Sequence, residues 1–111
     1  MKMTYVLNGA ILTDYGIFEF TRITLQEAKV IVHAAMFEHQ FQSAIGHNGT
    51  ALLLSKILEC NIPANRIQIR MQTEDYCVVF RLLTRLPEGT VLTEEELTKL
   101  PYEFGLLTRT K

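Results

Sequence analysis

The chain lacks the excess of positive charge that is typical of many proteins that bind nucleic acids. Its 111 residues include 11 Lys and Arg against 12 Asp and Glu, for a formal net charge of -1. Proteins that grip a duplex by counterion release usually carry a basic excess, so we expect no duplex nucleic acid as a partner. A small anionic ligand is still compatible with this charge, because a few arginines in one pocket suffice to bind it.

Metal-binding and nucleotide-binding motifs are also missing. The two cysteines, Cys60 and Cys77, form no CxxC pair, and a metal site would need more ligands at closer spacing. The sequence has no P-loop, no HExxH, no GxGxxG after a strand, and no acidic cluster of the kind that holds magnesium. We therefore expect reduced thiols, no metal and no cofactor.

Long apolar runs are absent as well. A membrane-spanning helix needs about 20 apolar residues, and the strongly apolar runs here are far shorter. Residues 1–9 contain no apolar core of a signal peptide. The sequence thus predicts a cytoplasmic protein with no membrane contact, located in the host cytoplasm if the protein is viral.

What is present is the composition of an ordinary globular domain. Hydrophobic residues make up 48% of the chain and charged residues 21%, and the length suits a single domain over residues 1–111. Alternating apolar and polar residues predict strands, and a continuous apolar run predicts a central one. These strands are expected at Met3–Leu7, Phe41–Ile45, Arg66–Gln72 and Tyr76–Leu83.

Helices are expected at two places with clear start signals. Thr24 and Glu27 match the capping box, in which each side chain satisfies a free backbone donor of the other residue. A leucine-rich second helix is expected over Ala51–Glu59, with Asn48 or Thr50 as its N-cap.

The remaining stretches read as loops and one short helix. They are a loop at Ala10–Arg22 that could contain a short strand at Ile17–Phe20, a hairpin-sized turn at Thr73–Asp75, a capping box at Thr93–Glu96 that opens a short helix to Leu100, and a tail at Tyr102–Leu107. The fold class that follows is α/β, a single domain in which a mixed sheet is flanked by helices.

The first candidate site is the junction Gly46-His47-Asn48-Gly49-Thr50, between a strand and a helix. A helix N-terminus binds anions well, because its unpaired N–H groups and its dipole favour negative charge. A histidine beside a bound phosphate can act as a general acid or base near neutral pH. The simpler alternative is a capping or solvated histidine.

Two further candidate sites lie at the ends of other predicted strands. One follows Tyr76–Leu83, and the other begins Arg66–Gln72. Arg85 could clamp a phosphate with its planar guanidinium, and Glu88 could orient a hydroxyl or a protonated histidine. A weak surface ion pair is the alternative for these two. Arg66, at the start of a predicted strand, could equally be an ordinary exposed arginine. Without metal, RNA cleavage would use the 2′-hydroxyl as nucleophile, and the protein would supply phosphate stabilisation and an acid.

Several stretches of the chain together resemble the viral type III anti-CRISPR ring nuclease family, found in archaeal viruses, bacteriophages and integrated bacterial elements. They are Ser43-Ala44-Ile45-Gly46-His47, Asn65-Arg66-Ile67, Arg85-Leu86-Pro87-Glu88-Gly89, Val91-Leu92-Thr93 and Pro101-Tyr102-Glu103-Phe104-Gly105. The resemblance covers nearly the whole chain.

The resemblance implies a homodimer that binds cyclic tetraadenylate on its two-fold axis and linearises it without metal, giving linear diadenylates. That ring is the messenger by which type III CRISPR systems activate ancillary nucleases, so its destruction would switch the signalling off. His47 is then the general acid, Arg85 contacts the scissile phosphate, Glu88 positions the reacting groups and Arg66 contacts the ring.

This chain departs from the family's pattern near its start. It has Asn8-Gly9-Ala10-Ile11 where archaeal viral members have Asn-Ala-Phe-Ser, so the resemblance carries over Asn8 as a ligand contact but not the serine. The loop Ala10–Arg22 is the candidate lid over the bound ring. Two other functions stay open: a binding protein that sequesters the ring without cutting it, and a structural or regulatory dimer.

Overall fold

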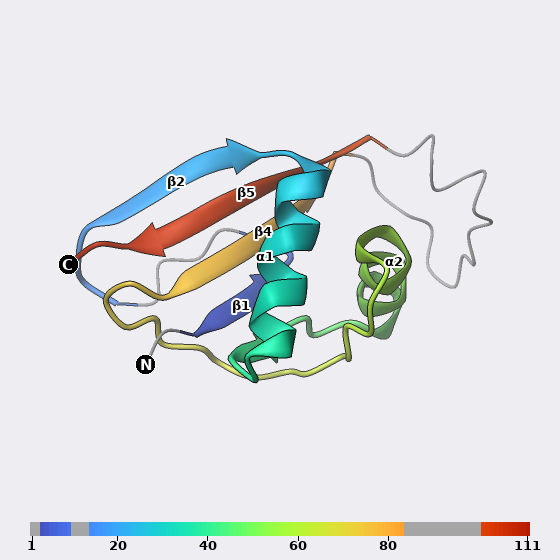
Figure 1. The fold of residues 1–111 in the computed structure, drawn as a ribbon, viewed down its shortest axis with the longest axis horizontal. Coiled ribbons are helices and arrows are strands. Elements are labelled where there is room, and N and C mark those ends of the chain that lie inside the picture. Colours follow the sequence, from blue (N-terminus) through green and yellow to red (C-terminus); the bar gives the residue numbers. More distant parts are fainter. Residues whose placement is uncertain (1–2, 10–13, 84–100) are drawn as a thin grey trace.

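The structure is a computed structural model that describes residues 3–9, 14–83 and 101–111. In these residues one sheet has the strand order β2-β5-β4-β1-β3, with two helices beside it (Figure 1). The elements, in chain order, are β1 (Thr4–Leu7), β2 (Phe18–Ile23), α1 (Leu25–Phe37), β3 (Phe41–Ser43), α2 (Asn48–Leu58), β4 (Tyr76–Leu82) and β5 (Tyr102–Arg109).

The sheet is mixed, as expected for this α/β domain. β1 lies between β3 and β4 and pairs parallel with both, with Val6 opposite Ser43 on one side and Val78 on the other. β5 pairs antiparallel with β4 and with β2. Four strands therefore point the same way, and the carboxyl ends of β1, β2, β3 and β4 meet at one edge of the sheet.

Both helices cover the same face of the sheet, so the predicted mixed sheet with helices packed on it is confirmed. α1 crosses in front of the strands and α2 lies beside it, towards the carboxyl edge (Figure 1). Their apolar side chains share one core with residues of β1, β4 and β5. Its buried members are Val6, Ala28, Val32, Ile45, Ala51, Leu53, Leu54, Ile57, Leu58, Ile62, Val78, Phe80 and Phe104.

The opposite face has a smaller core. Its buried members are Leu7, Ala44, Met71, Cys77, Val79 and Leu107. At its far end the ring of Phe20 lies against Gly105 so closely that a Cβ there would collide with the ring. Only glycine permits this approach of a side chain on β2 to the backbone of β5.

The start of α1 follows the sequence prediction. Thr24 Oγ1 accepts a hydrogen bond from Glu27 N (3.1 Å), and Glu27 Oε1 accepts one from Thr24 N (3.0 Å). The capping box is therefore confirmed.

Residues 66–72 do not form the predicted strand, and no hairpin joins them to β4. Ile69 and Met71 nevertheless pack on the second face of the sheet, while the alternate residues Gln68 and Arg70 are exposed. The alternation here reports which side chains are buried, and the backbone covers the sheet without pairing with it.

Two other expectations about loops were wrong. The short strand expected at Ile17–Phe20 is present but longer, as β2, so residues 18–22 belong to the sheet and cannot serve as a lid. Residues 10–13 of that loop, and the short helix expected up to Leu100, lie outside the described residues. The expected tail Tyr102–Leu107 is β5, which lies between β2 and β4 in the sheet.

Candidate functional site

The candidate residues of the sequence gather at the carboxyl edge of the sheet. Asn8 directly follows β1, and Gly46 and His47 follow β3, which pairs with β1. Ligands in α/β folds bind in the crevice outside the carboxyl ends of parallel strands, because loops and helix starts meet there. The fold thus places these residues where such a site is expected.

His47 is the N-cap residue of α2, which corrects the prediction of Asn48 or Thr50. Its backbone is extended (φ -120°, ψ 131°), and its carbonyl accepts the first helical hydrogen bond, from Ala51 N at 3.0 Å. Asn48 and Thr50 lie inside the first turn of the helix. The side chain of His47 makes no capping hydrogen bond and is exposed, so its imidazole is available to a ligand.

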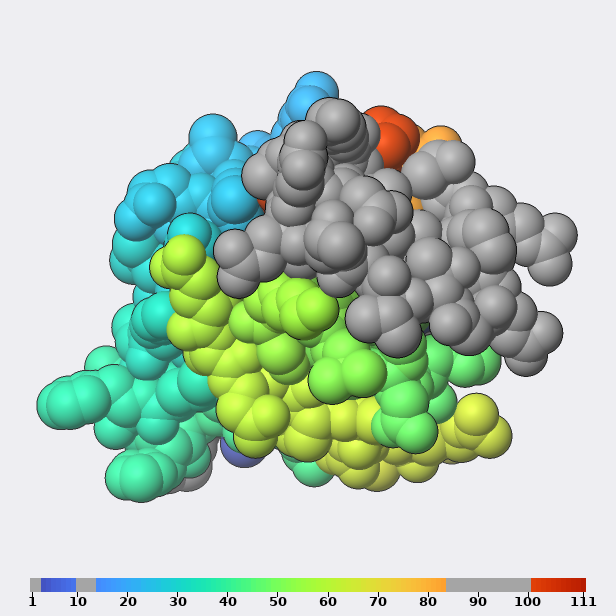
Figure 2. Space-filling view, turned by 90° about the vertical axis from the view of Figure 1, so that its right-hand side faces the viewer, coloured from blue at the N-terminus to red at the C-terminus, as the bar shows by residue number. Residues whose placement is uncertain are grey.

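The first turn of α2 presents backbone donors at the same point. The N–H groups of Asn48, Gly49 and Thr50 come before the first helical bond and have no partner within the helix. A Cβ added at Gly49 would have no heavy atom of the described chain within 4 Å. Figure 2 views this edge and shows α2, in green, at the surface beside the residues that follow it. The turn is therefore open to an anion.

Arg66 lies against this junction, although it is distant in sequence. Its Nη2 donates to the carbonyl of Gly46 at 3.3 Å, and its Nε would be 3.7 Å from a Cβ at Gly46. The side chain is exposed at the same time. The structure therefore brings the guanidinium next to the residue that precedes His47.

The sequence motifs include Asn65 and Ser43, but sequence reasoning did not predict the contacts by which these residues hold the arrangement. Asn65 donates from its backbone N to Ile45 O (2.7 Å) and from Nδ2 to Ser43 O (2.8 Å). Ser43 Oγ in turn donates to Pro63 O at 2.7 Å. These contacts join segments about 20 residues apart, and no local pattern in the sequence announces them.

Arg85 and Glu88 lie outside the described residues. In the sequence they follow β4, whose end at Leu82 is at the same edge of the sheet as the ends of β1 and β3. The described residues that the structure gathers here are Asn8, Gly46, His47, Asn48, Gly49, Thr50 and Arg66.

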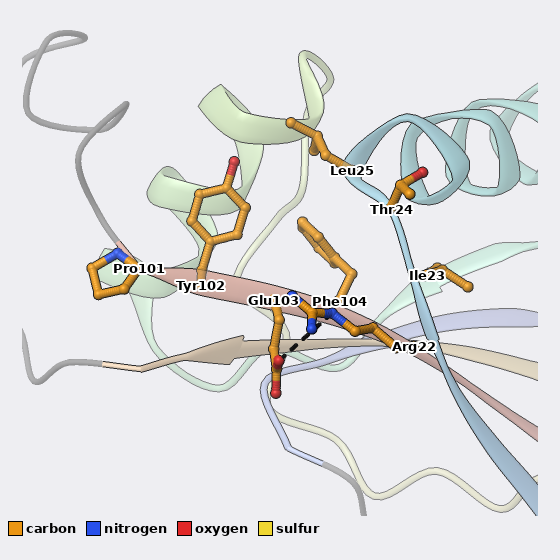
Figure 3. A pocket seen from close by; sticks show the side chains of 8 residues that line it. All are labelled: Arg22, Ile23, Thr24, Leu25, Pro101, Tyr102, Glu103 and Phe104. Atoms are coloured by element: carbon orange, nitrogen blue, oxygen red, sulfur yellow. Dashed lines mark ion pairs between the residues drawn. The ribbon is translucent and has the colours of Figure 1, made fainter.

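A separate pocket of about 670 Å³ lies further along the same edge, where β2 ends and β5 begins (Figure 3). Glu103 Oε2 forms an ion pair with Arg22 Nε (3.8 Å), and Glu103 Oε1 accepts a hydrogen bond from Arg81 Nη1 (2.9 Å). Tyr102 and Phe104 project to the opposite side of β5 from Glu103 (Figure 3). None of the junction residues lines this pocket. Its described lining is Arg22, Ile23, Thr24, Leu25, Pro101, Tyr102, Glu103 and Phe104.

Neither a metal centre nor a membrane span is found in the part of the chain that the structure describes. Within residues 3–9, 14–83 and 101–111, no three His, Cys, Asp or Glu side chains gather closely enough to hold a metal ion. No helix in these residues has the length and apolar character needed to cross a bilayer.

Comparison with known proteins finds relatives that are similar to this chain over almost its whole length. Residues 4–104 match the model of the STIV B116-like family. The uncharacterized protein YddF of Bacillus subtilis (strain 168) is 36% identical over 103 residues, covering 93% of this chain and 94% of that protein. Uncharacterized protein 26 of a Sulfolobus islandicus filamentous virus is 37% identical over 110 residues, covering 94% and 89%.

Among solved structures, B116 of Sulfolobus turreted icosahedral virus has a similar fold. The TM-score is 0.85, and the match covers 96% of this chain and 99% of that one, at 17% sequence identity. At that identity the likeness concerns the fold alone. The overall fold therefore recurs in a viral protein of quite different sequence.

Proposed function

Because this chain belongs to the STIV B116-like family, with relatives in archaeal viruses and in Bacillus, we propose that it is a metal-independent ring nuclease. Its substrate is cyclic tetraadenylate, which it linearises to diadenylates, switching off type III CRISPR signalling. One observation carries the proposal: an exposed His47 begins α2 beside the guanidinium of Arg66, at the carboxyl edge of the sheet.

The substrate is a ring of phosphodiesters, and the junction suits an anion. The open first turn of α2 offers N–H donors and the positive end of the helix dipole. Arg66 adds a full positive charge beside Gly46. The formal net charge of -1 does not oppose this, because a small anion responds to the groups beside it, here Arg66 and the first turn of α2.

Besides the substrate and protein side chains, the reaction needs only water as a proton acceptor. The ribose 2′-oxygen attacks the adjacent phosphorus and loses its proton to water, and the bond from phosphorus to the 5′-oxygen breaks. His47 gives its proton to that leaving oxygen, and the phosphate remains as a 2′,3′-cyclic ester. Arg85 and Glu88 take the roles of phosphate contact and positioning group that the family resemblance gives them.

The size and symmetry of the substrate favour a homodimer. A ring of four identical nucleotides can lie on a two-fold axis and present the same phosphate to each subunit. Two equivalent His47 side chains would then cut opposite bonds and release two dinucleotides. Asn8 directly follows β1, the strand paired with β3, and we expect it to contact the ring beside this junction.

The test is incubation of the purified protein with cyclic tetraadenylate in EDTA, with the products separated by chromatography. We expect wild type to give linear diadenylates and His47→Asn to bind the ring without cutting it. His39→Asn is the matched control, because His39 is also exposed but precedes β3, at the opposite edge of the sheet. Asparagine also tolerates the left-handed backbone of His39 (φ 57°).

Each other outcome contradicts the proposal in a defined way. Ring that is retained by wild type but never cut would identify a sequestering protein instead. Ring that is neither cut nor retained would leave the structural or regulatory dimer. Equal loss of turnover in the two histidine variants would remove His47 from the role of acid.

A further inference from the structure

We infer that Asn65 is a positioning residue, which holds the segment carrying Arg66 in register with the strand end that leads to His47. This inference rests on the proposed ring nuclease and adds a residue that neither the family resemblance nor the sequence motifs assign. Asn65 itself is half-buried and forms its contacts with the backbone.

Asn65 holds the end of β3 through two contacts at once. Its backbone N donates to Ile45 O (2.7 Å), and its side-chain Nδ2 donates to Ser43 O (2.8 Å). These carbonyls are two residues apart and belong to the chain that leads directly into Gly46. The next residue, Arg66, continues the series by donating to Gly46 O. Three successive contacts therefore align the two segments.

Ser43 reinforces the same alignment from inside the protein. It is 2% exposed, its Oγ donates to Pro63 O (2.7 Å), and the same oxygen accepts from Ile45 N (3.3 Å). Ile45 is fully buried in the core under the helices. The strand end is thus anchored, and Asn65 transmits its position to Arg66.

Residues 61–66, here called the return segment, also contact α2 at their other end. Ser55 Oγ accepts from Ile62 N (2.9 Å) and also lies 3.2 Å from Ile62 O. Residues 62–66 therefore span from the helix to the strand end, and His47 lies in the turn between those two elements. Loss of the Asn65 side-chain contact would release the return segment from the end of β3, while α2 and the core stay intact.

The consequence for catalysis differs from the consequence for binding. The ring is held through several phosphates, so its affinity is spread over many contacts. Proton transfer to one leaving oxygen depends on a single geometry, and misplacement by about 1 Å can cost up to about a hundredfold in rate. We therefore expect Asn65→Ala to lower kcat by roughly ten- to a hundredfold, with a smaller change in KM.

The experiment compares Asn65→Ala with Asn61→Ala in full-length protein. Asn61 is an exposed asparagine in the same return segment, and none of the contacts above involves it. The readouts are kcat and KM for cyclic tetraadenylate, the thermal unfolding midpoint, and the ring ¹³C signals of the three histidines. The His47 signal should shift or broaden in Asn65→Ala only, while those of His33 and His39 stay in place.

A second variant covers the case in which Asn65→Ala folds poorly. Asn65→Asp keeps the size of the side chain and removes the donor to Ser43 O, so its rate at saturating ring should fall in the same way. Wild type without turnover overturns both this inference and the proposed function. Active wild type with kcat unchanged in the Asn65 variants, or a loss of kcat that Asn61→Ala shares, overturns this inference alone.

Discussion

Cys77, the second residue of β4, is fully buried. Burial raises the pKa of its thiol from 9.0 to about 12, although the backbone of Leu7 partly opposes the shift. Cys60, after α2, is only half-buried, and burial raises its thiol pKa as well. Both cysteines are free, as the spacing of the sequence indicated.

The raised pKa of Cys77 makes stability fall in alkaline solution. Above pH 9.0 the unfolded thiol loses its proton while the folded thiol keeps it, so protons are bound preferentially by the folded state and deprotonation favours unfolding. Between pH 8 and pH 10 wild type should lose about 1.4 kcal/mol more unfolding free energy than Cys77→Ala. Urea unfolding at the two pH values measures this, and parallel losses would contradict it.

Among the elements, α1 has the most complete start signal. The reciprocal bonds of Thr24 and Glu27 satisfy two backbone donors that would otherwise lack partners. Thr24→Ala removes one of these bonds and should lower the free energy of unfolding by about 1 kcal/mol. Thr73→Ala, at an exposed turn, is the matched control for urea unfolding. Equal values for the two variants would show that the cap contributes nothing.

Sequence patterns located the elements whose signals are local. The capping box gave the start of α1, and alternation or continuous apolarity gave β1 and β4 to within one residue at each end. Residues 66–72 alternate equally well, yet form no strand, because alternation reports burial on one side and not hydrogen bonding. β5 was missed because Gly105 looks like a break, whereas in the sheet it accommodates the ring of Phe20.

For the candidate site as well, the sequence predicted the local features and not the contacts between distant segments. The strand-to-helix junction at Gly46 and His47 could be read from the sequence, since glycine and a polar residue end one element before a leucine-rich helix begins. The N-cap was placed wrongly at Asn48 or Thr50, because both are better capping residues than histidine. The role of Asn65 could not be predicted, because its partners are fixed only when the return segment folds against β3.

At the scale of the whole molecule, the proposed function requires two chains around one ring. Calorimetric titration of the His47→Asn variant with cyclic tetraadenylate should therefore give one ring per two chains, because that variant binds without cutting. Light scattering should give the mass of two chains. One ring bound per single chain would contradict a ligand on the two-fold axis while leaving the cutting reaction open to its own test.

The position of β5 between β2 and β4 also determines when the sheet can be completed during synthesis. Among the described strands, β2 pairs with β5 alone, and β5 spans residues 102–109, more than 75 residues after β2 ends. Contacts so distant in the chain slow folding, since the intervening loop must close first. Until residue 109 has left the ribosome, neither β2 nor the β5-facing edge of β4 can complete its pairing with β5.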